Sequence, residues 1–556
     1  SGAGALAKDG AGTLTLSTAN TYAGGTLVTA GTLNYSNASA LGSGLATFGG
    51  NATLQASTGV TVANPVAISS GVTGTFDTNG SAVTFSGAIS GAGDLAKSGS
   101  GTLTLSGTNT YDGATTVNAG TLKITNPAAL GSSTGSTTVG TGVDNGAKLQ
   151  LATTGNNTIA ENFTLSSSNS GLENVSGNNT LTGLITHGVN GSRLFPAGGT
   201  MIIAGGITAA TPGWNMTFQG SSGGVAVVSS SIDSRVGGIL SYMPNGQLFL
   251  TGSNAFTGQL NIQTGFVNVQ NSSALGAPSG GVNVQSTAAL QIQGNITVGA
   301  EAINLNGSGY NNDGTGALRN ISGTNTYGGL VTLAGTTRIN SDADTLTLSN
   351  GGTITGSGFG LSVGGSGNTV ISSAIGTGTG TLTKDGSGTV TLSGASTYTG
   401  TTTVSAGTLA FVGGSLTSSV TVAATAVLGF TVGSATTTDT SSVTFTAGAK
   451  VRITGTPTLA SYTLLTASSI SGTPVLETAI AGYALVVDGT ALKLTSTSAF
   501  GTWMSTNYPG LTGANALAGA DPDGDSLLNL QEFAFGTTPT LSSTGAIDYV
   551  AGGAVT

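Results

Sequence analysis

The sequence predicts an all-β protein built as a β-solenoid, in which short strands stack coil upon coil. Runs in which Val, Ile, Leu and Thr alternate with polar residues occur along the chain, and such alternation is typical of strands. The 95 glycines among 556 residues separate these runs and permit tight corners. One stretch of sequence also recurs several times along the chain. A solenoid core grows along one axis, so this length does not require several globular domains.

Composition narrows the class of protein further. Charged residues make up 6% of the chain, the formal net charge is −9, and the 12 Lys and Arg residues are scattered. This pattern argues against nucleic acid and anionic membranes as partners, because both require clustered basic residues. No apolar run is long enough to insert in a membrane. The chain has no cysteine and starts within a repeat without Met, so we expect a processed, secreted protein without disulfides.

The internal repeat has three strong and two weaker copies. The strong copies are AGTLTLSTANTYAGGTLVTAGTL (11–33), SGTLTLSGTNTYDGATTVNAGTL (100–122) and SGTVTLSGASTYTGTTTVSAGTL (387–409). The weaker ones are NGQLFLTGSNAFTGQLNIQTGFV (245–267) and SGTNTYGGLVTLAGTTRI (322–339). A Gly-x-Leu-x-Lys-x-Gly turn precedes each strong copy and contains Lys8, Lys97 or Lys384. We expect these lysines on the surface, where repeated charges would oppose aggregation.

Each copy predicts about one coil of the solenoid. In TLTLS the residues Leu14 and Leu16 point to one side of a strand and the polar residues to the other. An aromatic residue follows at the next corner, and TTVNAGTL supplies two more short strands separated by Ala-Gly. The aromatic residues are Tyr22, Tyr111, Phe256, Tyr327 and Tyr398. Their irregular spacing predicts unmarked coils between the copies and disfavours a propeller, which needs a stricter period.

The string GxLxKxGxGTLTLSGxNTYxGxTxVxAGTL resembles the autotransporter-associated β-strand repeat of large surface proteins from Gram-negative bacteria. The resemblance implies a right-handed parallel β-helix that is exported and either displayed on the cell surface or released. We expect the solenoid with these repeats over residues 1–410, and further β-rich coils or a terminal β-domain over 411–500.

The segment DPDGDSLLNLQE has the ligand spacing of a calcium loop. Hard oxygens at alternating positions can wrap around a cation that accepts six to eight of them. The candidate ligands are Asp521, Asp523, Asp525, the carbonyl of Leu527, Asn529 and Glu532. The early glycine resembles the Asp-Pro-Asp-Gly-Asp loops of thrombospondin-type-3 and dockerin modules. A solvated acidic turn is the alternative interpretation.

An apolar run follows the loop and favours a short helix that stops at Gly536. We therefore expect a small calcium-binding module over residues 501–540, with calcium as structural cofactor. A C-terminal strand or tail over 541–556 completes the expected organisation.

Catalytic constellations are poorly represented. The acidic residues before residue 500 are isolated, except for Asp342 and Asp344 near Arg338, which we interpret as a solvated turn. His187 is the only histidine and is expected to be a structural loop residue. Glycan-active β-helix enzymes need paired acids on one face. We therefore expect no enzyme, and a polysaccharide-active enzyme stays as a distant alternative.

The ends of a β-helix expose unpaired backbone groups, and this suggests a mechanical role. A second copy that stacks on such an end forms a heterologous, non-closing contact. We therefore expect an extracellular structural protein that assembles head to tail with itself into a calcium-stabilised surface filament. The main alternative is a monomeric adhesin passenger that binds glycans or other cells.

Overall fold

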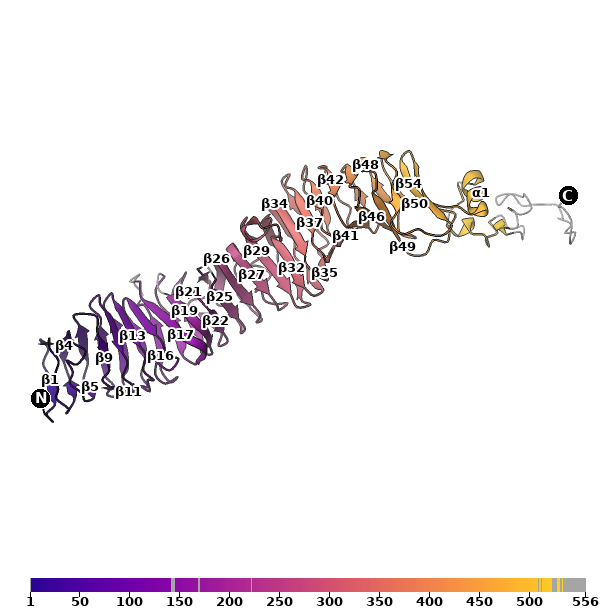
Figure 1. Cartoon of the computed structure of the whole chain (residues 1–556). Coiled ribbons are helices and arrows are strands. Elements are labelled where there is room, and N and C mark those ends of the chain that lie inside the picture. Colours follow the sequence, from indigo (N-terminus) through magenta and orange to yellow (C-terminus); the bar gives the residue numbers. More distant parts are fainter. Residues whose placement is uncertain are drawn as a thin grey trace, which may run out of the picture. The chain divides into compact units, whose positions relative to one another are not determined.

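The fold was taken from a computed structural model, which describes residues 2–141, 146–168, 171–221, 223–508, 510–511, 513–522, 528–530 and 533. The chain divides into two compact units, residues 1–330 and 331–556. Within each unit, successive short strands stack in parallel as coils of a β-solenoid (Figure 1). The predicted fold class is confirmed.

The first unit carries three stacks of parallel strands. The first stack has the order β1 (Leu6–Lys8), β3 (Thr26–Val28), β5 (Ala46–Phe48), β8 (Val66–Ile68) and β11 (Ile89–Gly91). The second has the order β2 (Thr13–Leu16), β4 (Gly31–Tyr35), β6 (Ala52–Ala56), β9 (Thr73–Asp77), β12 (Asp94–Ser98), β14 (Thr115–Val117), β16 (Ser136–Val139), β18 (Asn162–Leu165), β20 (Ile185–His187) and β23 (Ile207–Ala209).

The third stack of the first unit contains its longest strands. It comprises β7 (Thr61–Val62), β10 (Ala82–Phe85), β13 (Thr102–Leu105), β15 (Thr121–Ile124), β17 (Lys148–Ile159), β19 (Gly171–Leu181), β21 (Arg193–Pro196), β22 (Thr200–Ile203), β24 (Trp214–Gln219), β25 (Val225–Val228), β26 (Val236–Leu250), β27 (Leu260–Val269), β28 (Val282–Val284), β29 (Ala288–Gln293), β31 (Ile303–Gly307) and β32 (Leu318–Ser322). The pair β30 (Thr297–Val298) and β33 (Asn325–Tyr327) and the short helix η1 (Tyr310–Asn312) complete the unit.

The second unit continues the same architecture and ends differently. One stack comprises β34 (Val331–Ser341), β36 (Thr353–Gly356), β37 (Leu361–Gly364), β39 (Ala374–Gly376), β40 (Leu382–Lys384), β42 (Thr402–Val404), β45 (Val420–Val422), β48 (Ser442–Phe445) and β51 (Ser469–Ser471). A second comprises β35 (Thr345–Leu348), β38 (Asn368–Ile371), β41 (Thr389–Leu392), β43 (Thr408–Phe411), β46 (Val427–Thr431), β49 (Lys450–Thr454) and β52 (Val475–Leu476).

The last sheet of the second unit departs from parallel stacking. Its order is β44 (Ser415–Leu416), β47 (Thr437–Asp439), β50 (Ser461–Thr466), β54 (Ala491–Ser496) and β53 (Tyr483–Asp488). β54 runs antiparallel to both of its neighbours. Helix α1 (Ala499–Asn507) and the short helix η2 (Gly513–Ala516) follow, and the sequence pattern did not predict α1. Ser498 begins α1 because its side chain accepts a hydrogen bond from the Gly501 N–H.

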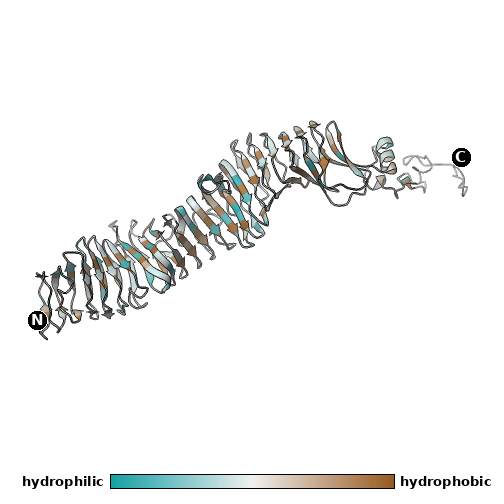
Figure 2. Ribbon diagram, in the orientation of Figure 1, coloured by the Kyte–Doolittle hydropathy of each residue, from teal (hydrophilic) through white to brown (hydrophobic). Residues whose placement is uncertain are grey.

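Each coil buries alternate residues of its strands. Leu6 pairs with Thr26, Thr26 with Ala46 and Ala46 with Val66, so a coil takes 20 residues here. In β13 the side chains of Leu103 and Leu105 are fully buried, while those of Thr102 and Thr104 are half-buried. Figure 2 shows this alternation of hydrophobic and hydrophilic residues along the strands. The alternation predicted from TLTLS is thus what forms the core.

Candidate functional site

The three repeat lysines are buried, and the predicted surface position is wrong. Lys8 is 6% exposed, Lys384 is 1% exposed and Lys97 is fully buried. A buried ammonium group requires hydrogen-bond partners, because desolvation of an unpaired charge costs several kcal/mol. The hydrogen-bond partners of each ammonium group therefore explain how these lysines can be buried.

Each ammonium group donates to three backbone carbonyls in the same pattern. The Lys97 Nζ lies 2.7 Å from the carbonyl oxygens of both Ser98 and Gly99, and 3.0 Å from that of Ala119 in the next coil. It also lies 3.1 Å from the Thr78 hydroxyl. We call a lysine with its three carbonyls a lysine clamp. Because the third carbonyl belongs to the following coil, the clamp joins two coils.

The other two clamps repeat this geometry. Lys8 bonds the carbonyls of Asp9 and Gly10 and, at 2.9 Å, that of Ala30. Lys384 bonds the carbonyls of Asp385 and Gly386 and, at 3.0 Å, that of Ala406. In each case the acceptor in the next coil is the alanine of the Ala-Gly corner. The Lys-x-Gly turn and the Ala-Gly corner of the repeat are therefore the two halves of one contact.

The glycine of the Ala-Gly corner is required by this close approach. Gly120 has φ +65°, and a Cβ atom placed on it would lie 2.5 Å from the carbonyl oxygens of Gly99 and Gly101. Gly407 has φ +64°, and its Cβ would lie 2.7 Å from the Lys384 Nζ. Only glycine fits both the left-handed conformation and the available space.

The aromatic residue of the repeat fills the next corner, which we call the aromatic corner. The hydroxyl of Tyr111 shares a 2.6 Å hydrogen bond with the Thr115 hydroxyl, and Tyr398 shares one of 2.5 Å with Thr402. Both tyrosines are fully buried. The side-chain amide of Asn109, two residues before Tyr111, donates to the Ala129 carbonyl of the next coil at 2.6 Å. The Asn109 bond joins the Asn-Thr-Tyr segment of one coil to the Ala-Leu-Gly segment of the next, whereas the tyrosine hydroxyl bonds lie within one coil.

One repeat copy lacks the lysine. The copy at 245–269 has Ser241 in the place of Lys97, because Ser241 pairs with Ile262 as Lys97 pairs with Val117, and the Ser241 side chain is fully buried. Its aromatic corner is intact, because Phe256 is fully buried and the Asn254 amide donates to the Ala274 carbonyl at 2.7 Å. The aromatic corner and the lysine clamp are thus separable features of the repeat.

Other buried titratable groups are shifted by burial. Burial lowers the pKa of Lys97 and of Lys384 to about 8, and that of His187 to about 4. It raises the pKa of Glu161 and of Glu301 to about 7. Glu161 accepts a 2.9 Å hydrogen bond from the Thr137 hydroxyl, which only partly offsets this shift.

The two buried glutamates predict that the first unit loses stability between about pH 5 and pH 8. Their folded-state pKa lies above the ordinary value, so the stabilisation is complete below about pH 4.5 and is lost as the pH rises through 7. We expect a loss on the order of 2 kcal/mol per glutamate. The melting temperature of the wild type should fall relative to that of an E161Q/E301Q variant as the pH rises over this range. A difference in melting temperature that does not change with pH would contradict the prediction. His187 is present in both proteins, so its opposite contribution to the pH dependence cancels in this comparison.

His187 ends strand β20 and is not a loop residue. It is 1% exposed, and its Nδ1 lies 2.8 Å from the Ser192 hydroxyl oxygen. The structural role that we expected is consistent with this burial.

Arg338 forms an ion pair with Asp385. Its guanidinium contacts both carboxylate oxygens of Asp385, at 2.7 and 2.8 Å. The ion pair spans the strand that lies between β34 and β40, at Gly364. A Cβ atom on Gly364 would lie 1.9 Å from an Asp385 carboxylate oxygen. The glycine makes room for the ion pair between Arg338 and Asp385.

Most of the predicted calcium loop lies outside the described residues. This holds for Asp523, Asp525, Leu527 and Glu532. Asp521 is described and exposed. Asn529 is fully buried, and its amide donates to the carbonyls of Asn515 and Leu517 at 2.7 and 2.8 Å.

The side-chain oxygen of Asn529 is buried, and no donor reaches it within the described part of the chain. An orphaned buried oxygen fits a cation ligand. In the part of the chain that the structure describes, no three His, Asp or Glu side chains form a group that could hold a metal.

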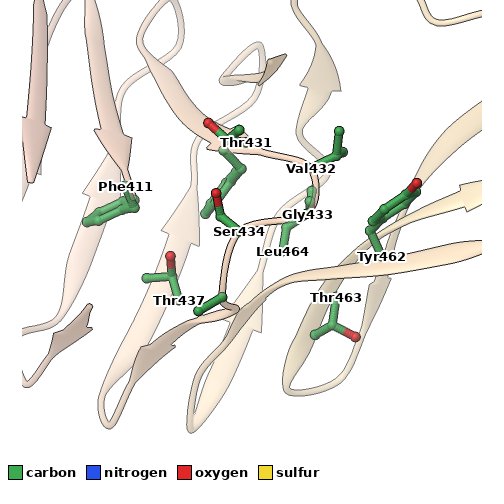
Figure 3. Close-up of a pocket in the computed structure, with 11 residues that line it drawn as sticks. Phe411, Thr431, Val432, Gly433, Ser434, Thr437, Tyr462, Thr463 and Leu464 are labelled. Carbon is green, nitrogen blue, oxygen red and sulfur yellow. The ribbon is translucent and has the colours of Figure 1, made fainter. Parts of the chain in front are cut away.

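A small cavity lies between the last coils of the second unit (Figure 3). Its volume is about 20 Å³, which is enough for one water molecule but not for a substrate. Phe411 and Phe430 stack on one side of it, with 6.0 Å between their ring centroids. The Tyr462 hydroxyl oxygen accepts hydrogen bonds from the N–H groups of Thr458 and Leu459. The cavity is a packing feature of these coils.

Among the described residues, no helix is long and apolar enough to cross a membrane.

Comparison with known proteins identifies the repeat. Four segments match the passenger-associated-transport-repeat family: residues 6–34, 95–124, 245–269 and 382–411. Three of them contain a lysine clamp and all four contain an aromatic corner. No curated protein and no solved structure matches the chain.

Proposed function

We propose that the chain, a β-solenoid in which four segments match the passenger-associated-transport-repeat family, is an extracellular structural protein whose subunits assemble head to tail into a surface filament. Passenger-associated repeats imply a secreted or cell-surface protein. The lysine clamps carry the structural part of the proposal. Their buried ammonium groups join one coil to the next.

Unpaired strand edges support the assembly. Among the described residues, β1 pairs only with β3, and β53 pairs only with β54. The side chain of Val486 on β53 is 42% exposed beside this edge. A strand edge with exposed apolar side chains is a template for strand addition from another chain. Such a contact between unlike surfaces does not close and therefore makes an open polymer.

Calcium is the second element of the proposal. The orphaned Asn529 oxygen is one ligand of the proposed site, together with the carboxylates of Asp521, Asp523, Asp525 and Glu532 and the Leu527 carbonyl. A bound cation would order this segment by neutralising the clustered carboxylates. Its role is structural cement.

Negative-stain electron microscopy of the purified protein, with calcium and then with a chelator, tests this function. We expect long unbranched fibres that shorten or fray when calcium is removed. The variant V486K adds a charge next to the proposed edge and should abolish the fibres. Its matched control is V412K, because Val412 is 51% exposed and lies outside the strands. Single particles of one subunit's length under all conditions would refute the filament.

A further inference from the structure

A groove lies on the outer face of the first unit, over β21, β24, β26 and β27. Two adjoining cavities of about 490 Å³ each form it. They share four lining residues, Gly191, Thr217, Leu240 and Gln263. We call this surface the side groove. Each half is within the usual size of a small-molecule site.

The groove is built from outward side chains of four successive coils. Arg193 pairs with Thr217, Thr217 with Leu240, and Leu240 with Asn261, so these residues form a row across the strands. At the usual strand spacing the row is about 14 Å long. An extended chain molecule could therefore lie across the coils and contact the same position of each.

The asparagines of the side groove bond to neighbouring coils, as most outward polar groups do, but its glutamines differ. Outward amides and acids generally bond to the next coil, as Gln55 does to Asp77 at 2.8 Å and Gln150 to Glu173 at 2.8 Å.

In the described part of the chain, the side chains of Gln219, Gln259 and Gln263 in the groove have no hydrogen-bond partner. Their donors and acceptors are free to bind a ligand that carries many hydroxyl groups.

Irregular backbone and an aromatic ring mark the same surface. The register of β24 and β26 shifts between Trp214 and Met216, at Asn215. The Asn215 side-chain oxygen accepts a 2.5 Å hydrogen bond from the Gly238 N–H, which fixes this amide at the rim. Tyr242 is 41% exposed and lines the groove beside Gln219. Bulges commonly re-aim side chains at functional sites.

We propose that the side groove binds an oligosaccharide segment of a polysaccharide. Unpaired amides can donate to and accept from sugar hydroxyls, and the exposed Tyr242 ring offers a face for a sugar ring. The lining residues include no Asp or Glu, so the groove holds no acid pair for hydrolysis. Arg193 is its only charged lining residue. The groove is a binding site and does not depend on filament assembly.

Titration calorimetry with defined hexasaccharides tests the proposal on the whole chain. The probes are a neutral β-1,4-glucan, a neutral α-1,4-glucan and an acidic galacturonan. We expect one class to bind and the variant Q263A/Y242A to weaken that binding by about tenfold or more. Binding of the galacturonan alone would assign a carboxylate contact to Arg193, which R193Q would then remove.

The matched control is Q285A, because Gln285 is exposed in the turn after β28 and outside the groove. It should bind like the wild type, and the melting temperature of each variant shows that the fold is retained. No binding of any probe at millimolar concentration, or equal loss in the groove and control variants, would overturn the proposal. Fibres that persist in the micrographs would show that the proposed filament survives this failure.

Discussion

Replacing Lys97 with Met should lower the local stability of its two coils by about 3 kcal/mol. The substitution removes the donor that the carbonyls of Ser98, Gly99 and Ala119 share, at 2.7, 2.7 and 3.0 Å. Each hydrogen bond to a charged group contributes about 1.5–3 kcal/mol. The pKa of Lys97, lowered to about 8, shows that burial of the ammonium costs on the order of 3 kcal/mol. Methionine also removes this desolvation cost, but the loss of three hydrogen bonds outweighs that gain.

Hydrogen exchange of peptides from residues 94–124 measures this effect, because a solenoid opens locally and need not unfold in one step. The Asn118 amide, which donates to the Lys97 carbonyl at 2.9 Å, reports on the joined coils. K123M is the matched control, since Lys123 lies half-exposed on β15. Protection that is equal in K97M and K123M would show that the clamp does not stabilise the stack.

The strand alternation in the sequence indicates that the clamp lysine points inward, although its charge is unusual for a core position. Leu95 and Lys97 are two residues apart in one strand, so both side chains point to the same side. Leu95 is buried, and therefore Lys97 points inward as well. The repetition of the lysine along the solenoid predicts a surface position instead, where repeated charges oppose aggregation. The compensating carbonyl of Ala119 belongs to another coil, and only the stacking register brings it within reach.

The coil architecture was predictable because its cause is local. Alternation in segments such as Thr102–Leu105 and glycine at the corners specify strands and turns directly. The side groove was not predictable, since Arg193, Thr217 and Leu240 meet only through the pairing of three strands. Helix α1 carries a Ser498 cap but also contains Gly501 within its first turn, which weakens its signal in the sequence.

The glycine of the Ala-Leu-Gly segment should be the most sensitive position of the aromatic corner. Gly131 has φ +85°, and a Cβ atom on it would lie 2.4 Å from the Tyr111 carbonyl oxygen and 3.1 Å from its ring. We expect G131A to cost about 3 kcal/mol or more, because backbone strain and overpacking of a buried ring add.

The control G71A separates these two causes. Gly71 has φ +73°, but a Cβ atom on it would meet nothing within 4 Å. Its replacement should therefore cost only the about 1 kcal/mol of the left-handed backbone. Local hydrogen exchange on both variants gives the two free energies of opening. If both substitutions lower the free energy of opening equally, the Tyr111 corner can move aside. Tyr111 would then occupy the corner without fixing the position of the next coil.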